Sequence, residues 1–213
     1  MEKQDIRSMY LTELEEMLGG LGQPKFRAAQ LFRWLQSGET EFDNMTNIPV
    51  SLRDELNEKT YIADVKIVRR LASKLDETVK YVYELYDGEY IESVLMKYEH
   101  GYTVCISTQV GCRMGCSFCA SGIAGLTRNL TASEMLAQIT AAQRDNGIRV
   151  SNIVMMGMGE PLDNFDNVTK YADIFTGVVS EGTIVVADDS AKTWVQSKLP
   201  AASKMVVKTV DEL

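Results

Sequence analysis

The stretch TASEMLAQITAAQRDNGIRVSNIVMMGMGEP, residues 131–161, decides the fold of this chain. It opens with the pattern of a capping box, in which Thr131 is the N-cap and Glu134 follows three residues later. Gly147 is placed to end the resulting helix, which we expect over residues 131–146. The apolar run that follows leads into a glycine-rich turn, which is typical of a buried strand.

A cysteine-rich segment separates this helix from an earlier apolar run. Residues 102–108, YTVCIST, are β-branched and aromatic and predict a strand. The order is then strand 102–108, cysteine loop, helix and strand 152–157. This order predicts a βαβ unit, in which the two strands lie parallel and adjacent.

The rest of the chain divides into regions of different pattern, and the whole is an α/β protein. Residues 1–60 predict a small helical accessory domain, with two helices separated by the GGLGQP stretch and a third after IPV. Residues 61–101 alternate like antiparallel strands and predict a β-hairpin extension. Residues 102–170 hold the βαβ core, and residues 171–213 predict a divergent βαβ-like tail.

Composition sets limits on the kind of protein. Of 213 residues, 45% are hydrophobic and 24% are charged, as in ordinary globular proteins, and no apolar run is long enough for a membrane span. The amino-terminal residues do not resemble a signal peptide, so we expect a cytoplasmic protein. A net charge of −8 argues against generic electrostatic binding to nucleic acids, although local basic patches still permit RNA binding.

Three of the four cysteines fall within eight residues. Cys112, Cys116 and Cys119 form a C-x3-C-x2-C pattern, which can hold three irons of a cubane cluster and leave the fourth iron open. A zinc site is the first alternative, with Cys105 as the fourth sulfur ligand. Reduced thiols without a metal are the second alternative.

Longer stretches resemble a known family. The cysteine pattern, with Phe118 before its last cysteine, is similar to the loop of radical-SAM enzymes. The segments CISTQVGCRMGCSFCASGIAGLTRNLTASEMLAQI and NIVMMGMGEPLDNFDNV resemble the RlmN/Cfr family of radical-SAM RNA adenine methyltransferases. LGQPKFRAAQLFRWL and YIESVLM match as well, so the similarity extends from about residue 8 to about residue 170.

The resemblance implies a cofactor site. The three loop cysteines, Cys112, Cys116 and Cys119, would ligate a 4Fe–4S cluster. Gly159 and Glu160 would contact the methionine part of S-adenosylmethionine. This placement is physically reasonable, because ligands of parallel sheets bind beyond the carboxyl ends of the strands.

The resemblance also implies a reaction and its partners. The substrate would be an adenine of 23S rRNA, modified at carbon 2, with tRNA as a further substrate and flavodoxin or ferredoxin as electron donor. Glu92 would be the proton acceptor. Cys105 would release the product by forming a disulfide with a methyl-carrying cysteine near the carboxyl terminus.

The family pattern stops after residue 170. The remaining 43 residues contain no cysteine, so the methyl carrier is missing from this sequence. They predict strand 183–187, helix 190–198 and strand 205–210, with a short similarity to mannose-type phosphotransferase IIB domains that lacks a phosphoryl-accepting histidine. We therefore expect a truncated or fused family member that is inactive on its own and has an incomplete partial barrel, with exposed strand edges. The alternatives are a non-catalytic 4Fe–4S-binding fragment and a four-cysteine zinc protein.

Overall fold

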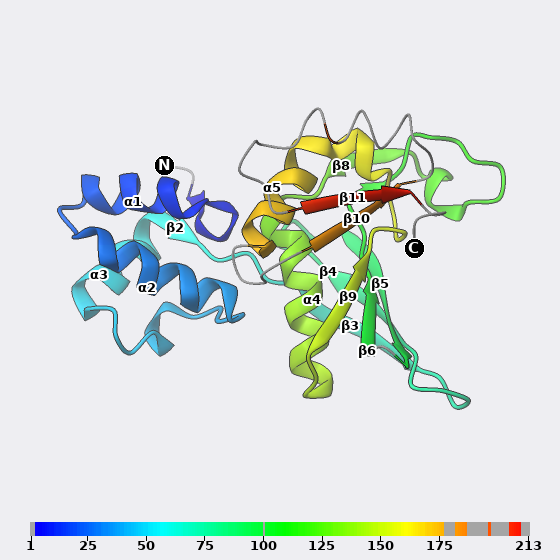
Figure 1. Ribbon diagram of the computed structural model, residues 1–213, viewed down its shortest axis with the longest axis horizontal. Coiled ribbons are helices and arrows are strands. Elements are labelled where there is room, and N and C mark those ends of the chain that lie inside the picture. The colour runs from blue at the N-terminus through cyan, green and yellow to red at the C-terminus, as the bar shows by residue number, and fades with distance from the viewer. Residues whose placement is uncertain (1–2, 100, 177–181, 187–195, 197–204, 210–213) are drawn as a thin grey trace.

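A five-stranded sheet is the centre of the computed structural model, which describes residues 3–99, 101–176, 182–186, 196 and 205–209 (Figure 1). The strand order is β3-β4-β5-β6-β9, antiparallel from β3 to β6 and parallel between β6 and β9. The predicted parallel pair is therefore confirmed. The strands are β3 Lys66–Ala72, β4 Val79–Glu84, β5 Tyr90–Tyr98, β6 Gly101–Cys105 and β9 Val150–Val154.

Three helices form the amino-terminal module, as predicted. Their bounds are α1 Leu11–Gly20, α2 Lys25–Gln36 and α3 Val50–Lys59. They enclose an apolar cluster of their own, and Phe32 of α2 packs against both this cluster and the cluster under the sheet. Short elements flank them: β1 Gln4–Asp5 pairs in parallel with β2 Thr60–Tyr61, and 3-10 turns cover Ile6–Ser8 (η1) and Phe42–Asn44 (η2).

The helix α4, Ala132–Asn146, covers one face of the sheet. Its predicted ends are confirmed: the Thr131 backbone N–H donates to the Glu134 carboxylate at 2.9 Å, and Gly147 adopts the left-handed conformation with φ +63°. Tyr83 of β4 lies under the helix, and its hydroxyl donates to the Gln138 carbonyl at 3.3 Å. Successive side chains of a strand point to opposite faces of the sheet. In β5 and β6, every second side chain therefore lies on the face that points away from α4.

The two parallel strands are shorter than the sequence predicted. The strand β6 ends at Cys105, although pairing continues, with the Ile106 N–H donating to the Val154 carbonyl at 2.9 Å. On the β5 side the regular ladder stops at Cys105, because the Ser107 N–H, the next one to face β5, donates to the Gln138 side-chain oxygen at 2.8 Å. Gln138 therefore joins α4 to the end of β6.

Several elements were not predicted. A hairpin of β7 Gln109–Gly111 and β8 Leu126–Asn129 encloses the cysteine segment. The helix α5, Phe165–Thr176, follows a 3-10 turn, η4, at Pro161–Asn164. A further 3-10 turn, η3, covers Ala120–Gly122.

The two predicted tail strands are present. The strands β10 Gly182–Val186 and β11 Met205–Thr209 pair in parallel with each other. The predicted helix 190–198 lies outside the described residues, apart from residue 196. Within the described part of the chain, β9 pairs only with β6, so its other edge has no strand partner there.

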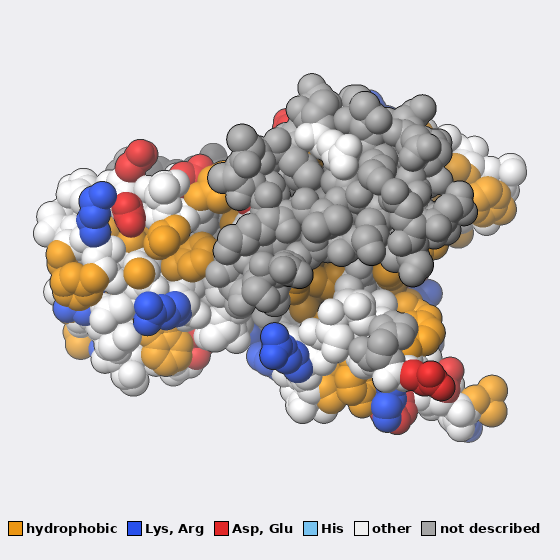
Figure 2. Space-filling view, viewed as in Figure 1, with side chains coloured by type: hydrophobic (Ala, Val, Ile, Leu, Met, Phe, Trp, Pro, Cys, Tyr) orange, Lys and Arg blue, Asp and Glu red, His pale blue; other side chains and the backbone are white. Residues whose placement is uncertain are grey.

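The surface of the amino-terminal module carries mixed charge. Figure 2 shows basic and acidic side chains interspersed over its helices. Among the helices that the structure describes, none has the length and apolar character needed to cross a membrane.

Candidate cofactor site

The cysteine loop leaves the sheet at the end of β6 and returns through the β7–β8 hairpin. At the neck of the loop the Cys112 N–H donates to the Gly125 carbonyl at 3.1 Å. Gly111 has φ +75°, and an added Cβ would lie 1.9 Å from the same carbonyl oxygen. Only glycine fits such an approach, so the neck fixes where the loop begins and ends.

The three loop cysteines are free thiols with different exposure. Cys112 is buried, Cys119 is half-buried and Cys116 is exposed, and the Cys119 N–H donates to the Cys116 carbonyl at 3.0 Å. Hydrogen bonding to the Ser121 hydroxyl and backbone lowers the pKa of the Cys119 thiol, which favours the thiolate that binds metals.

A preformed metal cage is absent from the described residues, where no three histidine, cysteine, aspartate or glutamate side chains converge. The donor chemistry of three free thiols on one loop fits an iron–sulfur cluster. The fourth cysteine, Cys105, is also free, so the structure does not show the disulfide expected at that residue.

The glycine-rich turn, from Gly157 to Glu160, passes very close to the backbone at the end of β6. An added Cβ at Gly157 would lie 2.7 Å from the Ile106 carbonyl oxygen, and one at Gly159 would lie 2.6 Å from the Gln109 Cβ. Gly159 also has φ +103°, which L-residues rarely adopt. The Glu160 carboxylate accepts the Leu162 N–H at 3.0 Å and so caps η4.

A salt bridge joins the turn to the cysteine loop. Arg113, directly after Cys112, pairs with Asp163 of η4. This guanidinium, together with the Gln109 amide, holds the pKa of the Asp163 carboxyl below its ordinary value. The loop and the turn are therefore neighbours at one edge of the sheet, as the parallel arrangement predicted.

Glu92 and Cys105 lie on the sheet face that points away from α4. Glu92 forms an ion pair with Lys80 at 2.8 Å, and its backbone carbonyl accepts the Ser107 hydroxyl at 2.6 Å. Cys105 is opposite Val94 in the β5–β6 register, and burial raises the pKa of its thiol. The structure thus places both residues on neighbouring strands, with Glu92 toward the cysteine-loop end.

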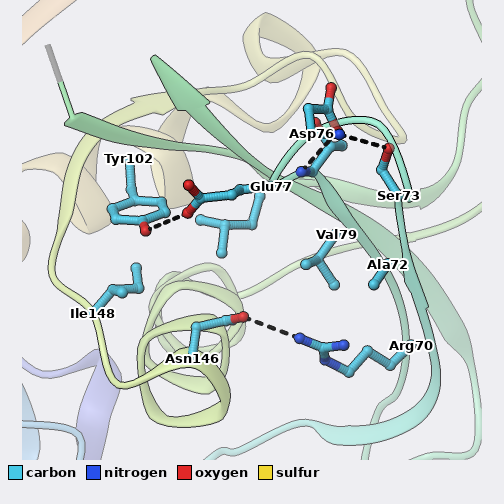
Figure 3. Close-up of a pocket in the computed structure, with 11 residues that line it drawn as sticks. Arg70, Ala72, Ser73, Asp76, Glu77, Val79, Tyr102, Asn146 and Ile148 are labelled. Atoms are coloured by element: carbon cyan, nitrogen blue, oxygen red, sulfur yellow. Dashed lines mark hydrogen bonds between the residues drawn. The ribbon is translucent and has the colours of Figure 1, made fainter. Parts of the chain in front are cut away.

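A separate pocket lies at the other end of the sheet (Figure 3). Tyr102, at the start of β6, donates its hydroxyl to Glu77 at 2.9 Å, and Arg70 donates to the Asn146 side chain at 3.2 Å. The cysteine loop follows the opposite end of the same strand. The pocket therefore does not belong to the candidate cofactor site.

Sequence reasoning missed two buried glutamines that hold the site. Gln138 exchanges hydrogen bonds with the Ser107 backbone at 2.8 and 2.9 Å, and Gln109 binds the glycine turn. For Gln138 the available signal was an amide side chain in a largely apolar helix segment, since a buried polar group needs partners.

The fold and the site define a class. Two adjacent parallel strands deliver a three-cysteine loop and a glycine-rich turn to one edge, which is the arrangement of the first part of a radical-SAM partial barrel. In agreement, the structure matches a radical SAM methyltransferase from Sphaerobacter thermophilus with a TM-score of 0.82 and 38% identity, over 96% of this chain and 63% of that chain.

Sequence comparisons specify the family. The family described as "Ribosomal RNA large subunit methyltransferase N-terminal domain" matches residues 4–62. A "Probable dual-specificity RNA methyltransferase RlmN" from Alkaliphilus oremlandii is 53% identical over 174 residues, 82% of this chain and 51% of that protein. The protein of the same name from Clostridium acetobutylicum is 52% identical over 162 residues, 76% of this chain and 47% of that protein. The chain belongs to the RlmN family of radical-SAM RNA methyltransferases, and it spans about half the length of these curated relatives.

Proposed function

We propose that this chain is the cofactor-binding front part of a radical-SAM methyltransferase that acts on carbon 2 of adenine in 23S rRNA and in tRNA. The observation that carries the proposal is the parallel pairing of β6 with β9, which brings the cysteine loop and the glycine turn to the same sheet edge. The names of the curated relatives support RNA as the substrate class.

The cysteine loop supplies the metal ligands in this proposal. Cys112, Cys116 and Cys119 would hold a 4Fe–4S cluster, which when bound would supply the electron that cleaves S-adenosylmethionine. Since the thiols do not converge in the structure, the segment between the neck residues would have to adjust for all three to ligate one cluster. Gly115 within this segment adopts a left-handed conformation, and no atom lies within 4 Å of its Cβ position.

The glycine turn supplies the seat for S-adenosylmethionine. Gly159 lets the backbone approach the ligand, and Glu160 offers a carboxylate to its amino group. Among the described residues, this carboxylate accepts a hydrogen bond from its own turn, at the Leu162 N–H. Exchanging one backbone donor for a charged ammonium group is favourable, because charge-assisted hydrogen bonds are the stronger ones.

The sheet face opposite α4 supplies the acid–base groups. Glu92 is the proposed proton acceptor, with Lys80 holding its carboxylate. Cys105 is the proposed resolving thiol, and its raised pKa means that it carries its proton at neutral pH until a base removes it.

Methyl transfer to RNA needs one more thiol than these 213 residues contain, since all four cysteines have other roles. We therefore propose that a polypeptide of this sequence alone binds and cleaves S-adenosylmethionine but does not methylate RNA. In a cell the partners are 23S rRNA, tRNA and a flavodoxin- or ferredoxin-type electron donor, in the cytoplasm.

The test is anaerobic incubation of the reconstituted chain with S-adenosylmethionine and dithionite, followed by measurement of 5′-deoxyadenosine and of methyl transfer to 23S rRNA. We expect 5′-deoxyadenosine from the parent chain, none from Cys116→Ser, and no methylated RNA from either. An iron-loaded chain that forms no 5′-deoxyadenosine would be a non-catalytic cluster-binding fragment, and bound zinc without sulfide would support the zinc alternative.

A further inference from the structure

Gln109, at the start of β7, has a fully buried side chain whose amide meets three different segments. Its Nε2 donates to the Asn129 Oδ1 at 2.8 Å and to the Asp163 Oδ2 at 3.0 Å. Its Oε1 accepts the Glu160 backbone N–H at 2.9 Å. Because a carboxamide has two N–H donors and one carbonyl acceptor, these partners fix the orientation of the group.

The three segments are the parts of the candidate site. Asn129 ends the strand that closes the cysteine loop, and Glu160 belongs to the glycine turn. Asp163 also pairs with Arg113 inside the cysteine loop. A continuous chain of polar contacts therefore runs from the loop through Asp163 and Gln109 to the backbone of Glu160.

Packing reinforces these polar contacts. The missing side chain of Gly159 leaves room for the Cβ and Cγ of Gln109, which would lie 2.6 and 2.8 Å from an added Cβ. The Gln109 backbone N–H also donates to the Met158 carbonyl at 3.2 Å. The glycine turn therefore contacts Gln109 in two ways. One contact is the backbone hydrogen bond at Met158, and the other is the close packing that the absence of a side chain at Gly159 permits.

We propose that Gln109 is a positioning residue that sets the glycine turn relative to the cysteine loop, and with it the seat of S-adenosylmethionine relative to the cluster. The inference rests on the function proposed above for this site. Gln109 acts through the Glu160 backbone and the Asp163 carboxylate. Its amide has no chemical role in the reaction itself.

The test uses an exchange of amide and carboxylate. Gln109→Glu keeps the shape of the side chain but removes both donors and places a carboxylate against that of Asp163, which is unfavourable in a buried site. Adding Asp163→Asn restores one pair, because the amide introduced at position 163 donates to the carboxylate introduced at position 109. The matched control is Gln143→Glu, since the Gln143 Oε1 likewise accepts a backbone N–H, that of Val150, at 2.9 Å.

Two readouts are needed. In the metal-free chain, hydrogen exchange should speed up in residues 157–163 and 111–126 for Gln109→Glu, remain at the parent rate for Gln143→Glu and slow again in the double variant. In the reconstituted chain, the change that S-adenosylmethionine causes in the electron paramagnetic resonance spectrum of the reduced cluster gives its affinity. We expect about a tenfold or greater loss for Gln109→Glu at unchanged iron content, with recovery in the double variant.

A second variant covers the case in which Gln109→Glu does not fold. Arg113 is exposed, so Arg113→Ala leaves the core intact and breaks only the loop end of the chain of contacts. Arg113→Ala should speed up hydrogen exchange in residues 157–163, because this segment contains Asp163, the partner of Arg113. Parent-like exchange and affinity in both Gln109→Glu and Arg113→Ala would overturn the proposal. If the parent chain loads iron but does not bind S-adenosylmethionine, the proposed function fails, and the exchange data still decide the positioning role.

Discussion

Gly159 shows at the residue scale how tightly the glycine turn is built. In Gly159→Ala the added Cβ would lie 2.7 Å from the Gln109 backbone nitrogen. The alanine would also be strained by the backbone angle φ of +103°. We expect a loss of about 3 kcal/mol or more in the free energy of unfolding, measured by urea denaturation. The control is Gly88→Ala, which has φ +83° but no atom within 4 Å and should cost only about 1 kcal/mol. Equal losses would mean that the close contact is unimportant.

Cys105 offers a residue-scale test of burial. Because burial raises the pKa of its thiol, less reactive thiolate is present at pH 8 in the folded chain than in the unfolded chain. Alkylation of Cys105 by iodoacetamide, followed by peptide mass spectrometry, should be slower than in urea and slower than at the exposed Cys116. Its rate should continue to rise as the pH increases above 9. Equal rates at the two cysteines in the folded chain would contradict the half-buried placement of Cys105.

At the scale of elements, the helix α4 depends on one buried carboxylate. Glu134 caps the helix and receives two hydrogen bonds of 2.8 Å from the Arg128 guanidinium. Glu134→Ala removes both interactions and should lower the free energy of unfolding by about 3 kcal/mol in urea titrations. Glu134→Gln keeps a capping oxygen and should lose roughly half as much.

The comparison for α4 is an exposed pair on another helix. Glu55 and Lys59 form an i,i+4 pair at 2.7 Å, and Glu55→Gln should change stability by no more than about 0.5 kcal/mol. A similar small change for Glu134→Ala would show that the buried pair does not support the helix.

The sequence predicted those elements whose signals are local. The helix α4 has its capping box and Gly147 within its own segment, and β6 and β9 are rich in β-branched residues. The β7–β8 hairpin has no such signal, because its strands have only three and four residues and are brought together by the closed neck of the cysteine loop. The early end of β6 escaped prediction for a similar reason, since it depends on Gln138, a residue 31 positions away from Ser107.

The same difference applies to the candidate site. The motif and the parallel strands were enough to predict that the cysteine loop and the turn with Gly159 and Glu160 share one edge. The Gln109 network could not be predicted, because its partners lie 20 to 54 positions away and become neighbours only in the folded chain. The division of the chain at residues 60, 101 and 170 stays a prediction.

For the whole molecule, the contact between the amino-terminal module and the sheet includes a buried arginine beside the apolar packing of Phe32. Arg7 is 1% exposed, and its guanidinium donates to the Thr140 hydroxyl at 3.1 Å and to the Ala63 carbonyl at 3.3 Å. Burial lowers its pKa to about 10, so it remains charged at neutral pH. Arg144 of α4 adds a pair with Asp64 at 2.8 Å. We infer that the module and the sheet unfold together.

The prediction is tested with Trp34 of the module as a fluorescent probe, after Trp194→Phe removes the other tryptophan. Urea transitions followed by Trp34 fluorescence and by far-ultraviolet circular dichroism should coincide. Arg7→Ala should cost on the order of 3 kcal/mol, because it leaves buried polar partners unsatisfied. The exposed Arg33→Ala should cost no more than about 0.5 kcal/mol. Separate transitions in the parent chain would show that the two parts are independent.

The most direct measurement is anaerobic iron–sulfur reconstitution of the chain, with iron, sulfide and zinc analysis and a visible spectrum before and after dithionite. We expect about four irons and four sulfides per chain, with absorption that dithionite bleaches, and loss of the cluster in Cys112→Ser, Cys116→Ser and Cys119→Ser. Cys105→Ser should keep the full cluster. Stoichiometric zinc without sulfide, or loss of the metal in Cys105→Ser, would contradict the account.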